Sequence, residues 1–185
     1  IFKTISEYLR YELFLYGARR LVDRNHQLRT LSNPVLGAFI AEMKSETYLP
    51  NDVICKLGAQ VKNVYFINFG AVAIIDKFGS ELCHLDDGHA FGFMYLALPE
   101  VRDASPIEVV AAELSDIYSM HRQRFERFLA EHPDMRRNFE AAAQERVEIF
   151  KKYMGQLRGV DLMTEIRSQR LLEERRKRPR MPEVV

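Results

Sequence analysis

The sequence has few cysteines, almost no net charge and no long apolar run, and each absence narrows the class of protein. Its 185 residues include two cysteines, Cys55 and Cys83. Two free thiols in an otherwise ordinary composition are typical of a reducing compartment, not of a disulfide scaffold. Neither cysteine has a second cysteine or a histidine at ligand spacing, since His84 beside Cys83 is not a site by itself, so we expect no metal. The formal net charge of +1 gives no general attraction to nucleic acid.

The chain has no apolar run long enough to span a bilayer and no recognisable signal peptide. It begins in mid-pattern with Ile1-Phe2-Lys3, without a methionine, so we expect a fragment of a longer protein, which could itself lie in a membrane. Hydrophobic residues make up 47%, enough for one packed domain with helical attachments. The histidines are scattered without a nucleophile partner, so we expect no enzyme.

The hydrophobic period changes twice along the chain. Helical spacing dominates to about residue 43, where Asn33-Pro34 predicts a helix start with Asn33 as the cap. Residues 18–28 are predicted to form one short helix before it. From Glu46 to Met120 short alternating runs separated by glycine and Asp-Gly turns are typical of antiparallel strands.

Helical spacing returns at Arg122, in a short helix that ends at His132-Pro133 and a longer one after it. The apolar stripe of the longer helix consists of Met135, Phe139, Ala143, Val147, Phe150 and Met154. The pattern as a whole predicts an α+β fold. We expect an antiparallel, jelly-roll-like β-roll with a short internal helix after Gly92, flanked by N-terminal helices and two C-terminal helices.

Three parts follow from this pattern. Residues 1–43 are expected to be a helical segment, residues 44–158 the roll with its C-terminal helices, and residues 159–185 a charged tail. The basic run at 175–180 (RRKRPR) is expected to be solvated, although such a run could also meet anionic lipid or act as an import signal.

Three stretches carry a family resemblance. Residues 48–58 (YLPNDVICKLG) contain an apolar strand, a turn and a strand that ends in glycine, and residues 64–70 (VYFINFG) form an aromatic and aliphatic strand that closes on glycine. Residues 87–92 (DGHAFG) resemble a turn into a ligand-binding segment. Together with the order of elements, these stretches resemble the cyclic-nucleotide-binding domains.

Within that superfamily the chain is most similar to cation channels of the hyperpolarisation-activated, cyclic-nucleotide-gated and ether-à-go-go types. Residues 53–56 (VICK) and 133–140 (PDMRRNFE) carry this likeness, and residues 1–43 resemble the later part of the channel C-linker. The resemblance implies the cytoplasmic regulatory domain of a homotetrameric channel. Its partners would be neighbouring copies of the chain and a transmembrane pore domain, with no nucleic acid.

The resemblance implies cyclic AMP or cyclic GMP as the ligand, but the ligand chemistry is incomplete. A cyclic phosphate favours a guanidinium and close backbone N–H groups, and Gly92 would allow such an approach. Binding members of the family have a glutamate after the Phe-Gly pair that accepts from the ribose hydroxyl. Here Phe91-Gly92 is followed by Phe93, which cannot accept a hydrogen bond and is expected to fill the pocket as core.

Two alignments compete for the family's phosphate-binding arginine. Counting back from the strand at 117–120 places that position on Ser105, with Glu108 adding a negative charge nearby. Counting forward makes Arg102-Asp103-Ala104-Ser105 the motif, followed by an insertion. The first alignment leaves no gap in the strand at 109–113, and both stay open. The pocket residues implied by resemblance are Phe91, Gly92, Phe93, Met94, Arg102, Ser105, Pro106, Ile107, Glu108 and Arg146.

Arg146 matches a purine-facing arginine of hyperpolarisation-activated channels, or else is a solvated side chain near Glu145 and Glu148. The hypothesis is a domain that binds cyclic nucleotide weakly or not at all. As in ether-à-go-go relatives, an intrinsic ligand segment could fill the pocket, and residues 153–157 (YMGQL) lie in about the right place. The alternative is a genuine cyclic-nucleotide sensor, in a channel, a sodium/proton exchanger or a soluble kinase-regulatory protein.

Overall fold

The computed structural model describes residue 6, residue 9, residues 12–13 and residues 16–152. The chain divides into two compact units, Ile1–Val147 and Glu148–Val185. The fold below is that of the first unit; of the second, residues 148–152 are described and are helical. The predictions for residues 153–157 and for the charged tail lie outside the described residues, as does much of the first predicted helical stretch.

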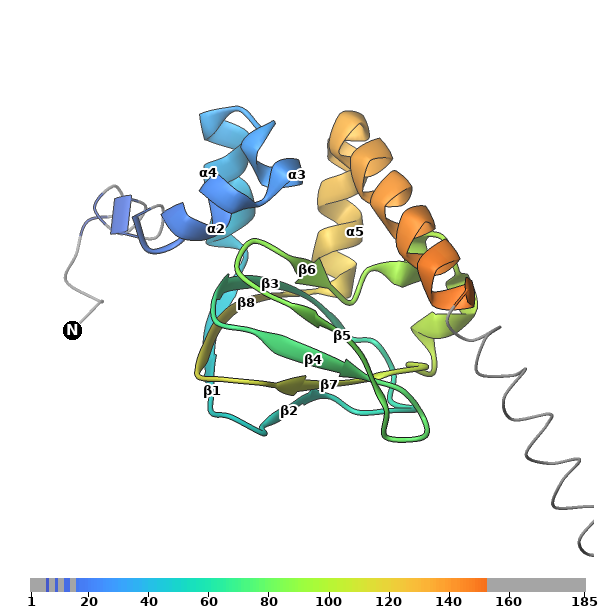
Figure 1. Cartoon of the computed structure of the whole chain (residues 1–185). Helices are drawn as coiled ribbons and strands as arrows, with labels where there is room; N and C mark the ends of the chain where they lie inside the picture. Colours follow the sequence, from blue (N-terminus) through green and yellow to red (C-terminus); the bar gives the residue numbers. More distant parts are fainter. Residues whose placement is uncertain (1–5, 7–8, 10–11, 14–15, 153–185) are drawn as a thin grey trace, which may run out of the picture. The chain divides into compact units, whose positions relative to one another are not determined.

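The described residues form two four-stranded antiparallel sheets that make up the β-roll (Figure 1). The strand order is β1-β8-β3-β6 in one sheet and β2-β7-β4-β5 in the other. The predicted roll is therefore confirmed. The strands are β1 (Lys44–Tyr48), β2 (Val53–Cys55), β3 (Asn63–Phe69), β4 (Val72–Ile75), β5 (Glu81–Leu85), β6 (Ala90–Phe91), β7 (Glu108–Ala111) and β8 (Ser115–His121).

Strand β3 is buried on both faces, which explains why its sequence is almost continuously apolar. Val64 and Phe66 belong to a core shared with the helices, whereas Tyr65 and Ile67 belong to the core inside the roll. Successive side chains of a strand point to opposite faces, so one strand contributes to both cores. The two-residue strand β6, which the sequence pattern did not reveal, pairs with Tyr65 and Phe66 of β3.

The helical segments before the roll are α2 (Arg19–Arg24), α3 (His26–Arg29) and α4 (Asn33–Ala41); α5 (Arg122–Glu131) and residues 133–152 follow it. No helix among the described residues combines the length and the apolarity that a bilayer crossing requires.

Two details of the helix predictions were wrong. The single helix predicted over 18–28 is two helices, because Asn25 has an extended backbone and its side chain accepts from the N–H of Leu28, capping α3. Asn33 does not cap α4: it is the first helical residue, and the extended Ser32 precedes it without a side-chain cap bond.

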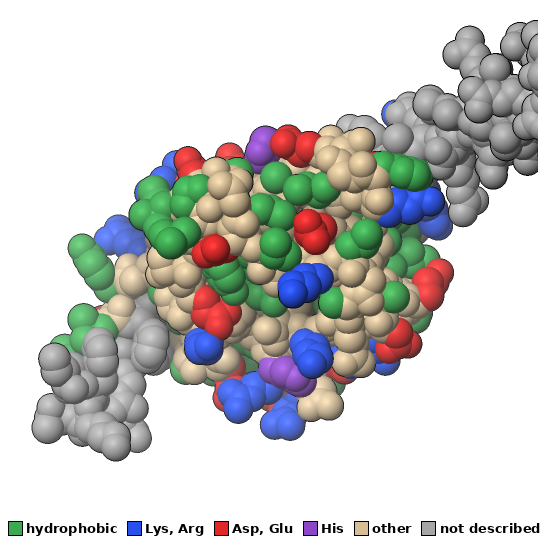
Figure 2. Space-filling view, turned by 90° about the horizontal axis from the view of Figure 1, so that it is seen from below, with side chains coloured by type: hydrophobic (Ala, Val, Ile, Leu, Met, Phe, Trp, Pro, Cys, Tyr) green, Lys and Arg blue, Asp and Glu red, His purple; other side chains and the backbone are tan. Residues whose placement is uncertain are grey.

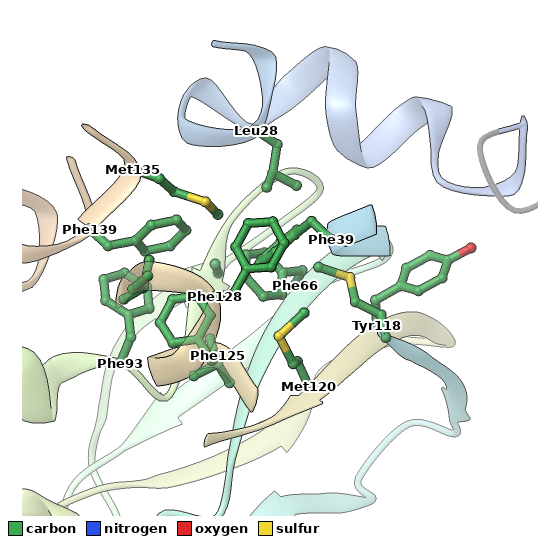
Figure 3. Close-up of a cluster of buried hydrophobic side chains, with 14 of the residues drawn as sticks. Leu28, Phe39, Phe66, Phe93, Tyr118, Met120, Phe125, Phe128, Met135 and Phe139 are labelled. Atoms are coloured by element: carbon green, nitrogen blue, oxygen red, sulfur yellow. The ribbon is translucent and has the colours of Figure 1, made fainter. Parts of the chain in front are cut away.

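An aromatic cluster joins the helices to the roll (Figure 3). The ring of Phe66 on β3 lies 5.6 Å from that of Phe39 on α4, 6.4 Å from Phe125 on α5 and 6.2 Å from Phe139 in the last helix. Phe39 also lies 4.8 Å from Phe128. Edge-to-face ring pairs of this kind add specific stabilisation to the burial of their area. The N-terminal helices and the C-terminal helices therefore share one core.

Replacing Phe39 tests this shared core. We expect Phe39→Ala to lower the free energy of unfolding by about 3–5 kcal/mol, because the truncation removes a fully buried ring and leaves a cavity. Urea unfolding followed by circular dichroism measures the change. The control is Phe78→Ala, whose ring is 49% exposed, with an expected change within about 0.5 kcal/mol. A small effect of Phe39→Ala would mean that the N-terminal helices do not contribute to the core.

Candidate functional site

The candidate site is the segment from Ala90 to Ile107, here called the cassette, which leads from β6 into β7. It contains two short 3-10 helices, η2 (Met94–Leu96) and η3 (Pro99–Arg102). Gly92 lies between β6 and η2 with φ of +86°, and a Cβ there would lie 2.6 Å from the carbonyl oxygen of Asn63. The glycine is therefore required for the cassette to lie against the start of β3.

Phe93, at the position of the expected ribose acceptor, is a core residue. Its side chain is 1% exposed, and its ring meets that of Phe139 edge-on at 5.3 Å, as Figure 3 shows. The neighbouring Phe91 faces the interior of the roll and stacks on Tyr65 at 4.8 Å, and Met94 is half-buried against the helical core. The expectation that Phe93 fills this position as core agrees with its burial.

Arg146 of the last helix contacts Phe93 and the backbone of Ala90. Its guanidinium carbon lies 4.7 Å from the centroid of the Phe93 ring, and its Nη1 donates to the carbonyl oxygen of Ala90. Burial lowers the pKa of Arg146 below its ordinary value, but a guanidinium stays protonated in proteins. A cation over an aromatic face contributes about 0.5–2 kcal/mol. Arg146 is therefore bound within the chain rather than solvated.

Arg102, the phosphate ligand of the forward alignment, contacts α5. Its guanidinium lies 3.6 Å from Oε1 of Glu126, and its central carbon is 5.6 Å from the ring centroid of Tyr95. Arg122 approaches the same ring at 5.7 Å. Burial raises the pKa of Tyr95, whose side chain is 2% exposed. Sequence reasoning missed Arg122 and Glu126, although their spacing of four residues puts them on one face of α5.

Ser105, the position given by the other alignment, is part of the backbone network of the roll. Its Oγ donates to the carbonyl oxygen of Ile107 at 2.8 Å, and its N–H donates to Ala59 at 2.8 Å. Its own carbonyl accepts from the N–H of Gly58 at 2.8 Å. Pro106 and Ile107 are half-buried, and Glu108 begins β7 opposite Ile75.

The site residues predicted from the sequence therefore separate into groups. Phe93 and Arg146, which are 53 positions apart, are in contact. Arg102 and Ser105, which are close in sequence, contact different elements. Within the described part of the chain no group of acidic, histidine or cysteine side chains could hold a metal ion. The cassette thus makes an aromatic and cationic contact with the last helix. Arg102 and Ser105 bond to other parts of the chain, whereas the buried hydroxyl of Tyr95 has no hydrogen-bond partner among the described residues.

Comparisons with known proteins identify the domain that contains the cassette. Residues 45–132 match the family model of the cyclic nucleotide-binding domain. The chain is 31% identical over 148 residues to potassium/sodium hyperpolarization-activated cyclic nucleotide-gated channel 1 of Homo sapiens and of Oryctolagus cuniculus, and to channel 4 of Homo sapiens. The match covers 80% of this chain, but 16% of channel 1 and 12% of channel 4. The chain thus spans a small part of these relatives.

A pair of glycine substitutions tests how the cassette is seated. Gly92 and Gly79 both have positive φ, +86° and +80°, but a Cβ at Gly79 would meet nothing within 4 Å. We expect Gly79→Ala to cost about 1–3 kcal/mol of stability from the backbone conformation alone. Gly92→Ala should cost distinctly more in urea unfolding, since it adds a clash with backbone. Equal costs for the two variants would mean that the cassette does not press on β3.

Proposed function

Because residues 45–132 belong to the cyclic nucleotide-binding domain family, we propose that the chain is the cytoplasmic regulatory region of a tetrameric cation channel. We propose further that its nucleotide pocket is degenerate and is filled by its own side chains. The observation that carries the second part is the burial of Phe93 between Phe139 and the guanidinium of Arg146.

The extent of the similarity favours a channel over a soluble sensor. It covers 148 residues, more than the family model matches, so it includes helical sequence that flanks the roll. The relatives are named as hyperpolarization-activated cyclic nucleotide-gated channels. A soluble kinase-regulatory or transcription-regulatory protein would share the roll with different flanking elements. The alternative is a genuine sensor of cyclic AMP or cyclic GMP, which would require a pocket that is open to nucleotide.

The pocket chemistry supports weak binding. A phenylalanine stands where the ribose acceptor is expected, Ser105 uses its hydroxyl on backbone, and Arg102 is paired with Glu126. Hydrogen bonds to charged groups contribute about 1.5–3 kcal/mol each. Losing two of them weakens binding by about two to four orders of magnitude, at about 1.4 kcal/mol per tenfold.

The packing of the helices supports a mechanical role. Phe39 of α4 and Phe139 of the last helix both pack on Phe66, so a movement of either helix changes the surroundings of the other. In the proposal, the roll and its last helix have alternative packings, and the N-terminal helices carry the change to neighbouring subunits and to the pore. A ligand, if one binds, acts by favouring one packing.

Neither catalysis nor nucleic-acid binding is part of the proposal. On the face seen in Figure 2, positive and negative side chains are interspersed among apolar ones. That face therefore presents no continuous basic stripe of the kind that tracks a phosphate backbone.

Calorimetric titration with cyclic AMP and cyclic GMP tests the degenerate pocket. We expect no saturable heat up to about 1 mM nucleotide, because the ribose acceptor and the free guanidinium are missing. The matched variant is Arg102→Ala, checked for folding by circular dichroism, which should titrate like the unaltered chain. Micromolar binding that Arg102→Ala abolishes would contradict the proposal and would show that the forward alignment is right.

A chimeric channel tests the regulatory role. This chain would replace the matching segment of human potassium/sodium hyperpolarization-activated cyclic nucleotide-gated channel 1, and currents would be recorded with and without cyclic AMP. We expect currents whose half-activation voltage does not respond to cyclic AMP, because the segment assembles but has no open pocket. The parent channel is the control. A response equal to the parent's would refute the degenerate pocket, and loss of current with normal surface expression would refute the channel role.

A further inference from the structure

The turn between β5 and β6 contacts the N-terminal helices and leads directly into the cassette. The carboxylate of Asp87 in this turn is 9% exposed and forms ion pairs with Arg20 and with Arg24, the latter at 3.4 Å. Its Oδ1 accepts from the N–H of Gly70 at 2.8 Å. A buried carboxylate that satisfies two arginines and a backbone amide holds α2 against the turn at a defined position.

The next residue of the turn touches the helices through its backbone. The carbonyl oxygen of Gly88 accepts from Nδ2 of Asn25 at 2.7 Å, and Asn25 is 2% exposed. Gly88 has φ of +86°, and a Cβ there would lie 2.5 Å from the Cβ of Arg24. Only glycine permits this approach, because any side chain would displace α2.

The same turn leads directly to the contact made by the last helix. Gly88 donates to Ile67 of β3, and Ile67 donates back to His89, each at 2.8 Å. The chain then enters β6, where Ala90 accepts from Arg146. Two residues, Gly88 and His89, therefore separate the carboxylate that holds α2 from the carbonyl that the last helix holds.

A second polar contact fixes the start of α2. Asn68 accepts from the N–H of Leu21 at 3.1 Å and donates to the carbonyl of Gly17 at 3.1 Å and to Asp116 at 2.9 Å. This contact lies on β3, away from the cassette. It shares no residue with the turn contact, so the two contacts can be altered separately.

From these contacts we infer that the β5–β6 turn is a mechanical joint, in which Asp87 passes displacements of the cassette and of the last helix to α2 and α3. The inference rests on the proposed function, for which it supplies the route between the pocket and the N-terminal helices. Asp87 is a positioning residue: it contacts the moving helix and no ligand.

Hydrogen exchange of the 185-residue chain tests the joint. In Asp87→Asn we expect amide exchange over α2 and α3 to become about tenfold to a hundredfold faster, since the charge-assisted bonds to both arginines weaken. Exchange in β3 and β8 should not change. The matched control is Asp86→Asn, whose carboxylate is 68% exposed and contacts only His89 among the described ion pairs. Equal effects of the two variants would overturn the inference.

The passage of a displacement from the last helix to α2 is measured by introducing Arg146→Ala into the unaltered chain and into the Asp87→Asn chain. In the otherwise unaltered chain, releasing the last helix should speed exchange in the cassette and also in α2. In the Asp87→Asn chain it should speed exchange in the cassette alone. An undiminished effect on α2 in the Asp87→Asn chain would overturn the joint.

If Asp87→Asn unfolds the chain, the double variant Arg20→Gln with Arg24→Gln replaces it in both experiments. This variant removes the two ion pairs but keeps the hydrogen bond between the Asp87 carboxylate and the N–H of Gly70. The nucleotide titration is a separate readout. Tight binding of cyclic AMP would refute the degenerate pocket without changing the hydrogen-exchange result. Equal exchange rates in Asp87→Asn and Asp86→Asn would refute the joint and leave the pocket proposal unchanged.

Discussion

The burial of Phe66 in the middle of β3 is the constraint on which the rest of this structure depends. Three helices place a ring against it, Phe39 from before the roll and Phe125 and Phe139 from after it. Because β3 is also central to its sheet, between β8 and β6, this one residue ties the roll to both sets of helices. Close-packed interiors transmit displacement rather than absorb it. A displacement of one helix therefore alters the packing of the other.

The cassette belongs to this core through Phe93. A residue at a ligand position has two uses, since it either meets a ligand or packs against protein, and Phe93 packs. Arg146 completes the arrangement by covering the ring and bonding to Ala90, which holds the last helix on the cassette without a nucleotide. In the proposed function, these contacts within the chain take the place of those that a nucleotide would make.

Apolar and polar contacts have different roles at the helix–roll boundary. The aromatic core stabilises the boundary through its buried apolar area and through edge-to-face ring pairs. The ion pairs and hydrogen bonds around Asp87 and Asn68 are directional, and they fix the position of α2. The apolar contacts therefore supply most of the stability of the boundary, and the polar contacts fix the position of α2 on the roll.

The class of fold could be predicted from the sequence, as could the core role of Phe93. Alternating strands, turn glycines and helical stripes are local patterns, and Gly88 and Gly92 have the positive φ that their turn positions implied. The partners of the charged side chains, in contrast, follow from the packing of distant segments. Arg102 lies on Glu126, Arg146 on Phe93 and Asp87 on Arg20, each pair separated by 24 residues or more. A long flexible side chain reaches many neighbours, and which one it meets depends on how distant segments pack, which local periodicity does not record.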